Sequence, residues 1–354
     1  MVTIFIGTIV SISSVYWLYI WVGLELNLIG FIPLIMFTKS IVEGESRVKY
    51  FVSQAIGSGL ILFGRLISFR VSFSWDLGSR LDNVGIWLVA GGLFLKLGLF
   101  PFHYWIPSVI AGMSWFSCIV LATWQKIGPL FLLNSFIDLG NASVLFYVMC
   151  AGAIGSSVIG GVGGLNQTQL RALLAYSSIN HLGWMSLRIM IGEWVFKIYL
   201  LRYIVISLPL FLVVWIRDFN SFFSLWKVRN SFFYYLFFLL MLLSLGGIPP
   251  LLGFFPKMIA IMIAAKLSWL IVISVIVVSS LLALFYYLSL FFSTYLCVSQ
   301  DTRKGRISFG NLLMLSFAFM LNVVIALFLL KSNLFILVCA SFSIKMELCC
   351  DVLS

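Results

Sequence analysis

Uninterrupted apolar stretches of about 20 residues run through this chain, and they decide what it can fold into, because a helix of that length crosses the hydrocarbon core of a bilayer. A membrane barrel is excluded, since its strands alternate apolar and polar residues over about ten positions. A soluble fold is excluded too: 62% of the residues are hydrophobic and 9% are charged, whereas soluble domains are about a quarter charged. The sequence therefore predicts an all-α membrane protein.

About eleven such runs follow one another, and each predicts a transmembrane helix. They occupy residues 2–21, 23–38, 50–69, 84–105, 106–136, 143–164, 170–190, 195–216, 232–253, 257–292 and 311–330. The runs at 106–136 and 257–292 are long enough to contain an additional break. No soluble domain separates the runs, so residues 1–354 form a single integral membrane domain, with helices to residue 331 and an interfacial tail over 332–354.

The net charge of +11 comes largely from basic residues between the apolar runs. No nucleic-acid-binding motif accompanies them, so they indicate membrane topology and contacts with lipid phosphates. Three groups follow the second, eighth and tenth runs: Lys39, Arg47, Lys49, Lys227, Arg229, Arg303, Lys304 and Arg306. The positive-inside rule places these loops and the N-terminus on the matrix or cytoplasmic side. Four cations in or beside the opposite loops argue against this orientation: Arg70, Arg80, Arg188 and Lys197.

Four ionisable residues interrupt the apolar runs: Glu25, Lys96, Lys126 and Lys257. One charge at the centre of a membrane helix costs about 2.5–3.5 kcal/mol, so four facing lipid unpaired would cost about 10–14 kcal/mol. They are therefore expected to face a hydrated or paired interior. The alternative is that they lie near helix ends and extend to the headgroups, which is the expectation for Arg65 and Lys266.

Prolines surround two of these lysines. Two prolines follow Lys96 and three precede Lys257: Pro101, Pro107, Pro249, Pro250 and Pro256. Because proline removes a backbone donor and breaks a helix, one broken helix is expected in each half of the chain. Broken helices with ionisable groups are typical of inverted-repeat transporters.

A lysine in such surroundings is suited to proton transfer, because the approach or withdrawal of a carboxylate changes the balance between its charged and neutral forms. Moving one charge across 100 mV takes about 2.3 kcal/mol. No P-loop or dinucleotide motif occurs, and the six cysteines lack the spacing of an iron–sulfur site. The energy for transport is therefore expected to come from partner subunits.

Two histidines are candidate proton relays, because imidazole titrates near neutral pH. His103 follows Pro101, and His181 lies in the sequence SSINHLGW. A hydrogen-bonded structural role is an equal alternative for both, and a metal site is not expected. The glycine-rich segment 160–164 fits close helix packing better than phosphate binding.

Seven stretches together resemble the chain 2 family of mitochondrial NADH–ubiquinone oxidoreductase (respiratory complex I). They are WVGLELN from residue 21, KYFVSQA from 49, KLGLFPFHYWIP from 96, TWQKIGP from 123, GGLNQTQLR from 163, AYSSINHLGWM from 175 and LGGIPPLLGFFPK from 245. Their order and spacing hold from residue 21 to about 257, and the rest of the chain matches only in hydropathy.

The resemblance implies an antiporter-like fold of two inverted repeats in the mitochondrial inner membrane, with the N-terminus on the matrix side. It implies that Glu25 pairs with Lys96 on the first broken helix, that Lys126 is the central lysine and that Lys257 lies on the second broken helix. It also implies that NADH, FMN, iron–sulfur clusters and ubiquinone are bound by partner subunits. The expected partners are neighbouring antiporter-like membrane subunits and phospholipids such as cardiolipin.

The function expected from these observations is proton translocation driven by NADH oxidation and quinone reduction elsewhere in the complex. One alternative is a subunit of a related cation/proton antiporter, which would exchange sodium for protons without NADH. A second alternative is a structural spacer, in which neutral replacements of the lysines lower assembly and leave the pumping ratio unchanged.

Overall fold

The computed structural model describes residues 1–36, 41–77, 82–138, 142–217, 232–249, 251–267 and 269–301. Within these ranges every regular element is a helix, and the one β-type contact is an isolated antiparallel bridge between Tyr16 and Asp76. The expected helix at 311–330 and the tail at 332–354 lie outside the described ranges. So do six of the cations that support the expected topology, Lys39, Lys227, Arg229, Arg303, Lys304 and Arg306, and one that argues against it, Arg80.

The helices run in the order α1 (Val2–Ser13), α2 (Trp17–Met36), α3 (Ile41–Ser72), α4 (Asn83–Leu97), α5 (Trp105–Gly112), α6 (Trp115–Ala122), η1 (Trp124–Lys126), α7 (Ile127–Asp138), α8 (Ala142–Gly163), α9 (Leu170–Ile191), α10 (Glu193–Arg217), α12 (Phe232–Gly246), α13 (Phe254–Lys266) and α14 (Leu270–Asp301). Six stretches in the described part are long and apolar enough to cross a bilayer: Trp17–Met36, Glu43–Arg70, Trp115–Ile137, Leu145–Gly163, Glu193–Ile216 and Leu270–Phe292.

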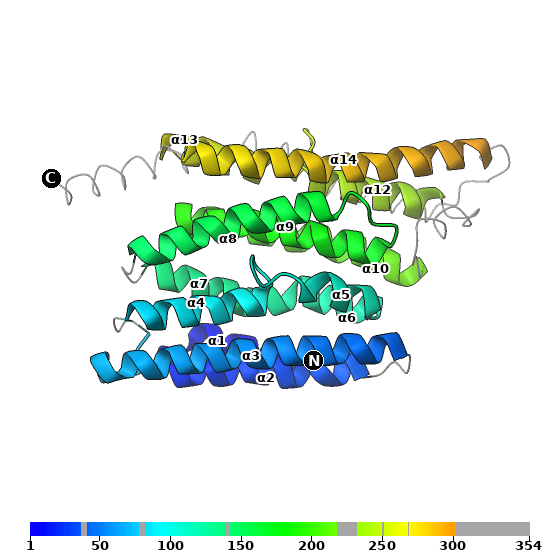
Figure 1. The fold of residues 1–354 in the computed structure, drawn as a ribbon. Coiled ribbons are helices and arrows are strands. Elements are labelled where there is room, and N and C mark those ends of the chain that lie inside the picture. The colour runs from blue at the N-terminus through cyan, green and yellow to red at the C-terminus, as the bar shows by residue number, and fades with distance from the viewer. Residues whose placement is uncertain are drawn as a thin grey trace.

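The long helices lie side by side in layers that follow chain order (Figure 1). Helices α1 to α3 form one end of the stack, α4 to α10 form the middle, and α12 to α14 form the other end. The tightest neighbours are α3 with α4, α8 with α9, and α1 with α2. Helix α9 is buried on almost every side and carries His181 and Arg188, so its polar groups face other helices.

The first predicted helix was wrong in extent. The chain leaves helical geometry at Ser14, and α2 begins at Trp17, so the run at 2–21 is divided between two helices. The backbone N–H of Trp17 donates to the Trp75 carbonyl at 3.0 Å, and the N–H of Leu77 donates to Val15 at 2.8 Å. A hydropathy window misses this turn because Val15 and Tyr16 are themselves apolar or aromatic.

Glycine brings helices into close contact at two points. A side chain on Gly7 would meet the Asn27 nitrogen and the Gly23 carbonyl oxygen at 2.7 Å, where α1 crosses α2. A side chain on Gly160 would meet the Asn180 nitrogen at 2.4 Å, where α8 crosses α9. The predicted packing role of the glycine-rich segment is confirmed at this position, and it places α8 directly against the helix turn before His181.

Both long runs contain breaks, and helices also end next to two of the lysines. The run at 106–136 comprises α5, α6, η1 and α7, and the run at 257–292 comprises α13 and α14. Helix α4 ends at Leu97, one residue after Lys96, and α13 begins at Phe254, three residues before Lys257. The expected helices at 84–105 and 232–253 are therefore shorter than predicted, because α4 and α12 stop at Leu97 and Gly246.

Candidate functional site

Lys96 lies in the last turn of α4 and is only 7% exposed. Glu25, which is half-buried on α2, lies within electrostatic reach of the Lys96 ammonium. No direct ion pair joins these two side chains, whereas Lys49–Glu45 and Lys197–Glu193 do form salt bridges in the described part of the chain. Both of these pairs are on exposed surfaces.

Neutral donors satisfy the carbonyl groups at the end of α4. The indole N–H of Trp105 donates to the Leu95 carbonyl at 2.9 Å, and the Gln54 amide donates to the Lys96 carbonyl at 3.2 Å. Gly98 follows with φ of 72° and donates its N–H to Phe94 at 2.7 Å, which is the usual left-handed end of a helix. Lys96 is thus held where a helix ends inside the protein.

A small cavity connects Lys96 with Lys126. Its lining includes both lysines together with Gln54, Gln125 and Trp105. The volume that water centres can occupy in this cavity is about 10 Å³, which is enough for about one water molecule. Polar groups from α3, α4, α5 and η1 meet here among apolar side chains, so the first two lysines line the same cavity.

Lys126 is buried in the short helix η1 between α6 and α7. Its ammonium donates to the Tyr203 hydroxyl at 3.4 Å and lies 5.1 Å from the centre of that ring. The ring of His181 is 5.3 Å from the Tyr203 ring, and His181 Nδ1 is hydrogen-bonded to the Tyr199 hydroxyl at 2.7 Å. His181 lies within electrostatic reach of both Lys126 and Lys257, so it links the two halves.

Lys257 lies in the first turn of α13 and is buried. Its ammonium donates to the Gly246 carbonyl at 2.7 Å and is 5.8 Å from the centre of the Trp184 ring. The four ionisable residues therefore lie on α2, α4, η1 and α13, with His181 on α9 between the last two. Helices α2, α4, α9 and α13 succeed one another through the stack in Figure 1, so these residues form a row that runs across the helices rather than along them.

Sequence reasoning missed two buried arginines beside Lys257. Arg188 was counted among the cations in or beside a loop, at the end of the expected helix at 170–190, but it is fully buried in α9. Arg202 was not singled out, although it interrupts the apolar run at 195–216 as plainly as Arg65 interrupts its own run. Both guanidinium groups pack on the ring of Tyr199, at 3.6 Å and 5.0 Å from its centre.

Arg65 also corrects an expectation, because it does not extend to the headgroups. It is 1% exposed, and its guanidinium donates to the carbonyls of Ser74 at 2.7 Å and Asp76 at 3.0 Å. It therefore anchors the segment after α3. Lys266, in contrast, is exposed at the end of α13, as expected.

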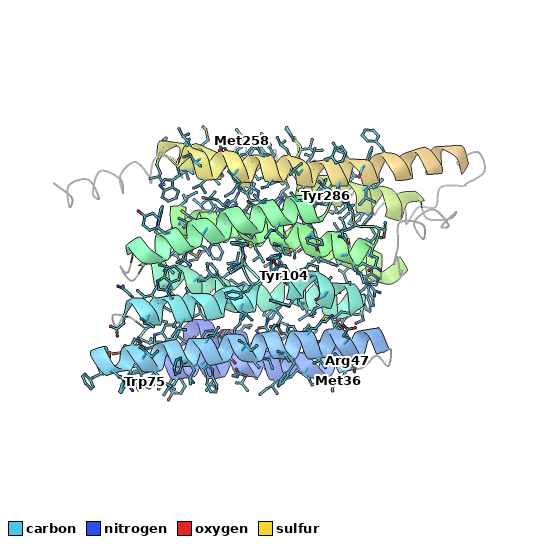
Figure 2. The ribbon with its side chains drawn as sticks, viewed as in Figure 1. Met36, Arg47, Trp75, Tyr104, Met258 and Tyr286 are labelled. Atoms are coloured by element: carbon cyan, nitrogen blue, oxygen red, sulfur yellow. The ribbon has the colours of Figure 1, made fainter. Side chains whose placement is uncertain are left out.

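His103 lies apart from the row. Its Nδ1 is 3.1 Å from the Pro101 carbonyl, and its ring packs on Tyr104 at 4.0 Å between centres. It lines an open pocket against α8 and α9 together with Tyr104 and Tyr176, and Tyr104 is labelled near the centre of Figure 2. Within the described ranges, no three His, Cys, Asp or Glu side chains gather where they could hold a metal ion.

Comparison with known proteins places this arrangement in a family. Residues 14–283 match the model of the family described as NADH:quinone oxidoreductase/Mrp antiporter, membrane domain. NADH-ubiquinone oxidoreductase chain 2 of the armadillo Dasypus novemcinctus is 36% identical over 307 residues, covering 86% of this chain and 87% of that protein. The protein of the same name from the mosquito Anopheles gambiae is 36% identical over 301 residues, covering 84% and 85%.

Solved structures agree in fold. A chain of respiratory complex I from Thermus thermophilus has a TM-score of 0.74 at 24% identity, covering 89% of this chain and 75% of that chain. A chain of an archaeal membrane-bound sulfane sulfur reductase has a TM-score of 0.82 at 19% identity, covering 92% and 71%. Together, the match over residues 14–283 and the extended likeness to chain 2 proteins show that this chain belongs to the NADH:quinone oxidoreductase/Mrp antiporter family, as a member of its NADH-ubiquinone oxidoreductase chain 2 group.

Proposed function

We propose that this chain is a proton-translocating membrane subunit of respiratory complex I, and that Glu25, Lys96, Lys126, His181 and Lys257 carry the protons. The observation that carries the proposal is the buried row itself. Three lysines and a histidine are each at most 7% exposed, and they succeed one another across the stack of helices. Burying so many basic groups is costly, and a structural role would favour paired charges, which this row lacks among the described residues.

Each step of the row has a physical link. Glu25 acts electrostatically on Lys96, and the cavity joins Lys96 to Lys126. Tyr203 joins Lys126 to His181, and His181 lies within electrostatic reach of Lys257. A change of charge at one end therefore changes the balance between charged and neutral forms at the next group. Protons passed along this row would respond to a charge arriving from a neighbouring subunit, which supplies the driving energy.

The position of the row leads to a proposed architecture. In this architecture, two transmembrane helices are interrupted, one beside Lys96 and one beside Lys257. Each belongs to one of two inverted repeats, within a domain of about eleven spans. Carbonyl groups freed at such breaks need donors, and polar backbone within a membrane is tolerated where it is covered by protein. His103 is an additional candidate relay at the first break, because it faces the pocket against α8 and α9.

The proposed setting is the mitochondrial inner membrane, with the N-terminus on the matrix side and other antiporter-like subunits of complex I as neighbours. Phospholipids such as cardiolipin are the expected lipid contacts, and nucleic acid is not an expected partner. NADH, FMN, iron–sulfur clusters and ubiquinone are assigned to partner subunits, and this chain contributes to NADH:ubiquinone reduction only through coupling. Relatives named NADH-ubiquinone oxidoreductase chain 2 support this setting.

Proton pumping per electron tests the proposal in complexes that carry Lys96→Ala or Lys257→Ala. We expect a lower ratio of protons to electrons with the complex still assembled. An unchanged ratio in both variants refutes the assignment of these lysines.

The alternative function is cation/proton exchange. It is supported by the fold likeness to a chain of the Mrp complex from Dietzia, which has a TM-score of 0.74 at 18% identity. Measuring sodium flux separates the two functions. Vesicles that contain the assembled complex should acidify on addition of NADH in the absence of sodium. Sodium-dependent acidification without NADH would favour the exchanger.

A further inference from the structure

The two helix breaks are closed by chemically different donors. The carbonyls at the end of α4 accept from neutral groups, the Trp105 indole and the Gln54 amide. The carbonyls at the end of α12 accept from cations. The last four carbonyls of a helix lack intrahelical partners and form the negative end of its dipole. At the second break, cations satisfy this negative end.

Every carbonyl of the last turn of α12 has a donor. The N–H of Gly247 lies 3.1 Å from the Leu243 carbonyl and 3.2 Å from that of Ser244. Arg202 Nη2 donates to Ser244 at 3.0 Å and to Leu245 at 3.3 Å. Lys257 Nζ donates to Gly246 at 2.7 Å. Arg202 and Lys257 therefore donate to consecutive carbonyl groups at the end of α12.

Arg188 holds the other side of the same break. Its Nη2 donates to the Pro256 carbonyl in the first turn of α13 at 3.2 Å, and its Nη1 donates to Trp184 at 2.6 Å. Tyr199 lies against both guanidinium groups, so one aromatic ring sets the distance between them. The two arginines thus hold the end of α12 and the start of α13 from helices α10 and α9.

The break is packed tightly around these arginines. A side chain on Gly253 would meet the Ser244 carbonyl oxygen at 1.7 Å and Arg202 Nη2 at 2.6 Å. Only glycine fits between the returning chain and the bonded carbonyls. Neither arginine makes an ion pair with a carboxylate in the part of the chain that the structure describes, so backbone carbonyls and Tyr199 take the place of a counter-ion.

We propose that Arg188 and Arg202 are positioning residues that keep the second break in place while Lys257 gains and loses its proton. This inference rests on the proposed role of Lys257 in proton transfer. An arginine stays charged under all physiological conditions, whereas a buried lysine can lose its charge. When Lys257 is neutral, Arg202 still satisfies the two adjacent carbonyls, so the end of α12 does not unwind with each cycle.

Backbone hydrogen exchange in the assembled complex tests this directly, in peptides that cover residues 240–249. Arg202→Leu should raise exchange of the last turn of α12 by about tenfold to a hundredfold, since bonds from a charged donor are lost. Arg202→Lys should give a smaller rise. Lys257→Met, which removes the charge of Lys257 permanently, should change exchange by less than about threefold, because Arg202 remains.

Lys197→Gln is the matched control, because Lys197 lies on α10 with Arg202 but is exposed and paired with Glu193. It should leave exchange unchanged. The proposal is overturned if Lys257→Met loosens the turn as much as Arg202→Leu does, or if neither Arg202 variant loosens it. If Arg202→Leu does not assemble, Arg202→Lys and Lys257→Met still decide the question.

Proton pumping, measured on the same samples, keeps the two proposals apart. Normal pumping by Lys257→Met would remove the proton-carrying role of that lysine, whatever the exchange data show. Unchanged exchange in the Arg202 variants would remove the positioning role, whatever the pumping data show.

Discussion

Replacing Lys126 by methionine should make the protein more stable and less able to pump. Lys126 is 4% exposed, and among the described residues its ammonium donates to one side chain, the neutral Tyr203 hydroxyl, at a long 3.4 Å. Burying the charge costs about 2.5–3.5 kcal/mol. A hydrogen bond from a charged donor returns about 1.5–3 kcal/mol, and this long bond belongs at the lower limit. Methionine of similar length removes both terms, so we expect stabilisation by about 1–2 kcal/mol.

Arg65→Met is the matched control, because it also removes a buried positive charge, but one that makes shorter hydrogen bonds than Lys126 does. Arg65 donates to the Ser74 and Asp76 carbonyls at 2.7 Å and 3.0 Å, and both carbonyls would lose this donor. We expect destabilisation by about 3 kcal/mol. Because Arg65 is not in the row, complexes that do assemble with Arg65→Met should pump normally.

The assay is denaturant unfolding of the full chain in lipid nanodiscs, combined with protons pumped per electron by assembled complexes. The expected pattern is opposite for the two variants: Lys126→Met gains stability and loses pumping, and Arg65→Met loses stability and keeps pumping. If Lys126→Met is destabilised as much as Arg65→Met, Lys126 is a structural anchor and the expected gain in stability is contradicted.

Three further substitutions test other parts of the site. Tyr199→Phe removes the hydroxyl 2.7 Å from His181 Nδ1 but keeps the ring, so pumping should fall several-fold with normal assembly; normal pumping would take His181 out of the row. Gly160→Val places methyl groups against Asn180 and should lower the free energy of unfolding by about 1–3 kcal/mol; no change would contradict the close contact of α8 and α9. Trp105→Phe removes the donor to Leu95, so hydrogen exchange at the end of α4 should rise about fivefold, and unchanged exchange would argue against that bond.

Local sequence revealed the parts of the site that depend on local chemistry. Lys96 and Lys257 stand out because a charge and several prolines interrupt an apolar run. One helix ends one residue after Lys96, and another begins three residues before Lys257. Their burial follows from the cost of charge in lipid, which any fold must avoid. The cavity between Lys96 and Lys126 could not be predicted in the same way, because it depends on how α3, α4 and η1 pack.

Arg65, Arg188 and Arg202 were misjudged or missed because the rule for membrane cations does not say where each side chain points. Long basic side chains near a predicted helix end are often topology signals, and Arg188 was assigned in that way. Its real partners, Trp184 and Pro256, are respectively one helix turn away and 68 residues away in sequence. Arg202 lies in the middle of an apolar run, and that local signal was sufficient to mark it as an interior group.

The turn between α1 and α2 shows the opposite limit. Its residues are apolar enough to continue a helix, and what ends the helix is backbone pairing with the segment around Trp75 and Leu77. Such pairing joins residues about 60 positions apart, so no window along the sequence reveals it.

The most direct measurement of the central claim is the number of protons translocated per NADH oxidised by complexes in which Lys257 is alanine, with Arg65→Met complexes measured alongside. If the buried row carries protons, the ratio falls for Lys257→Ala and is unaltered for Arg65→Met. Equal ratios in both would mean that the buried row does not carry protons.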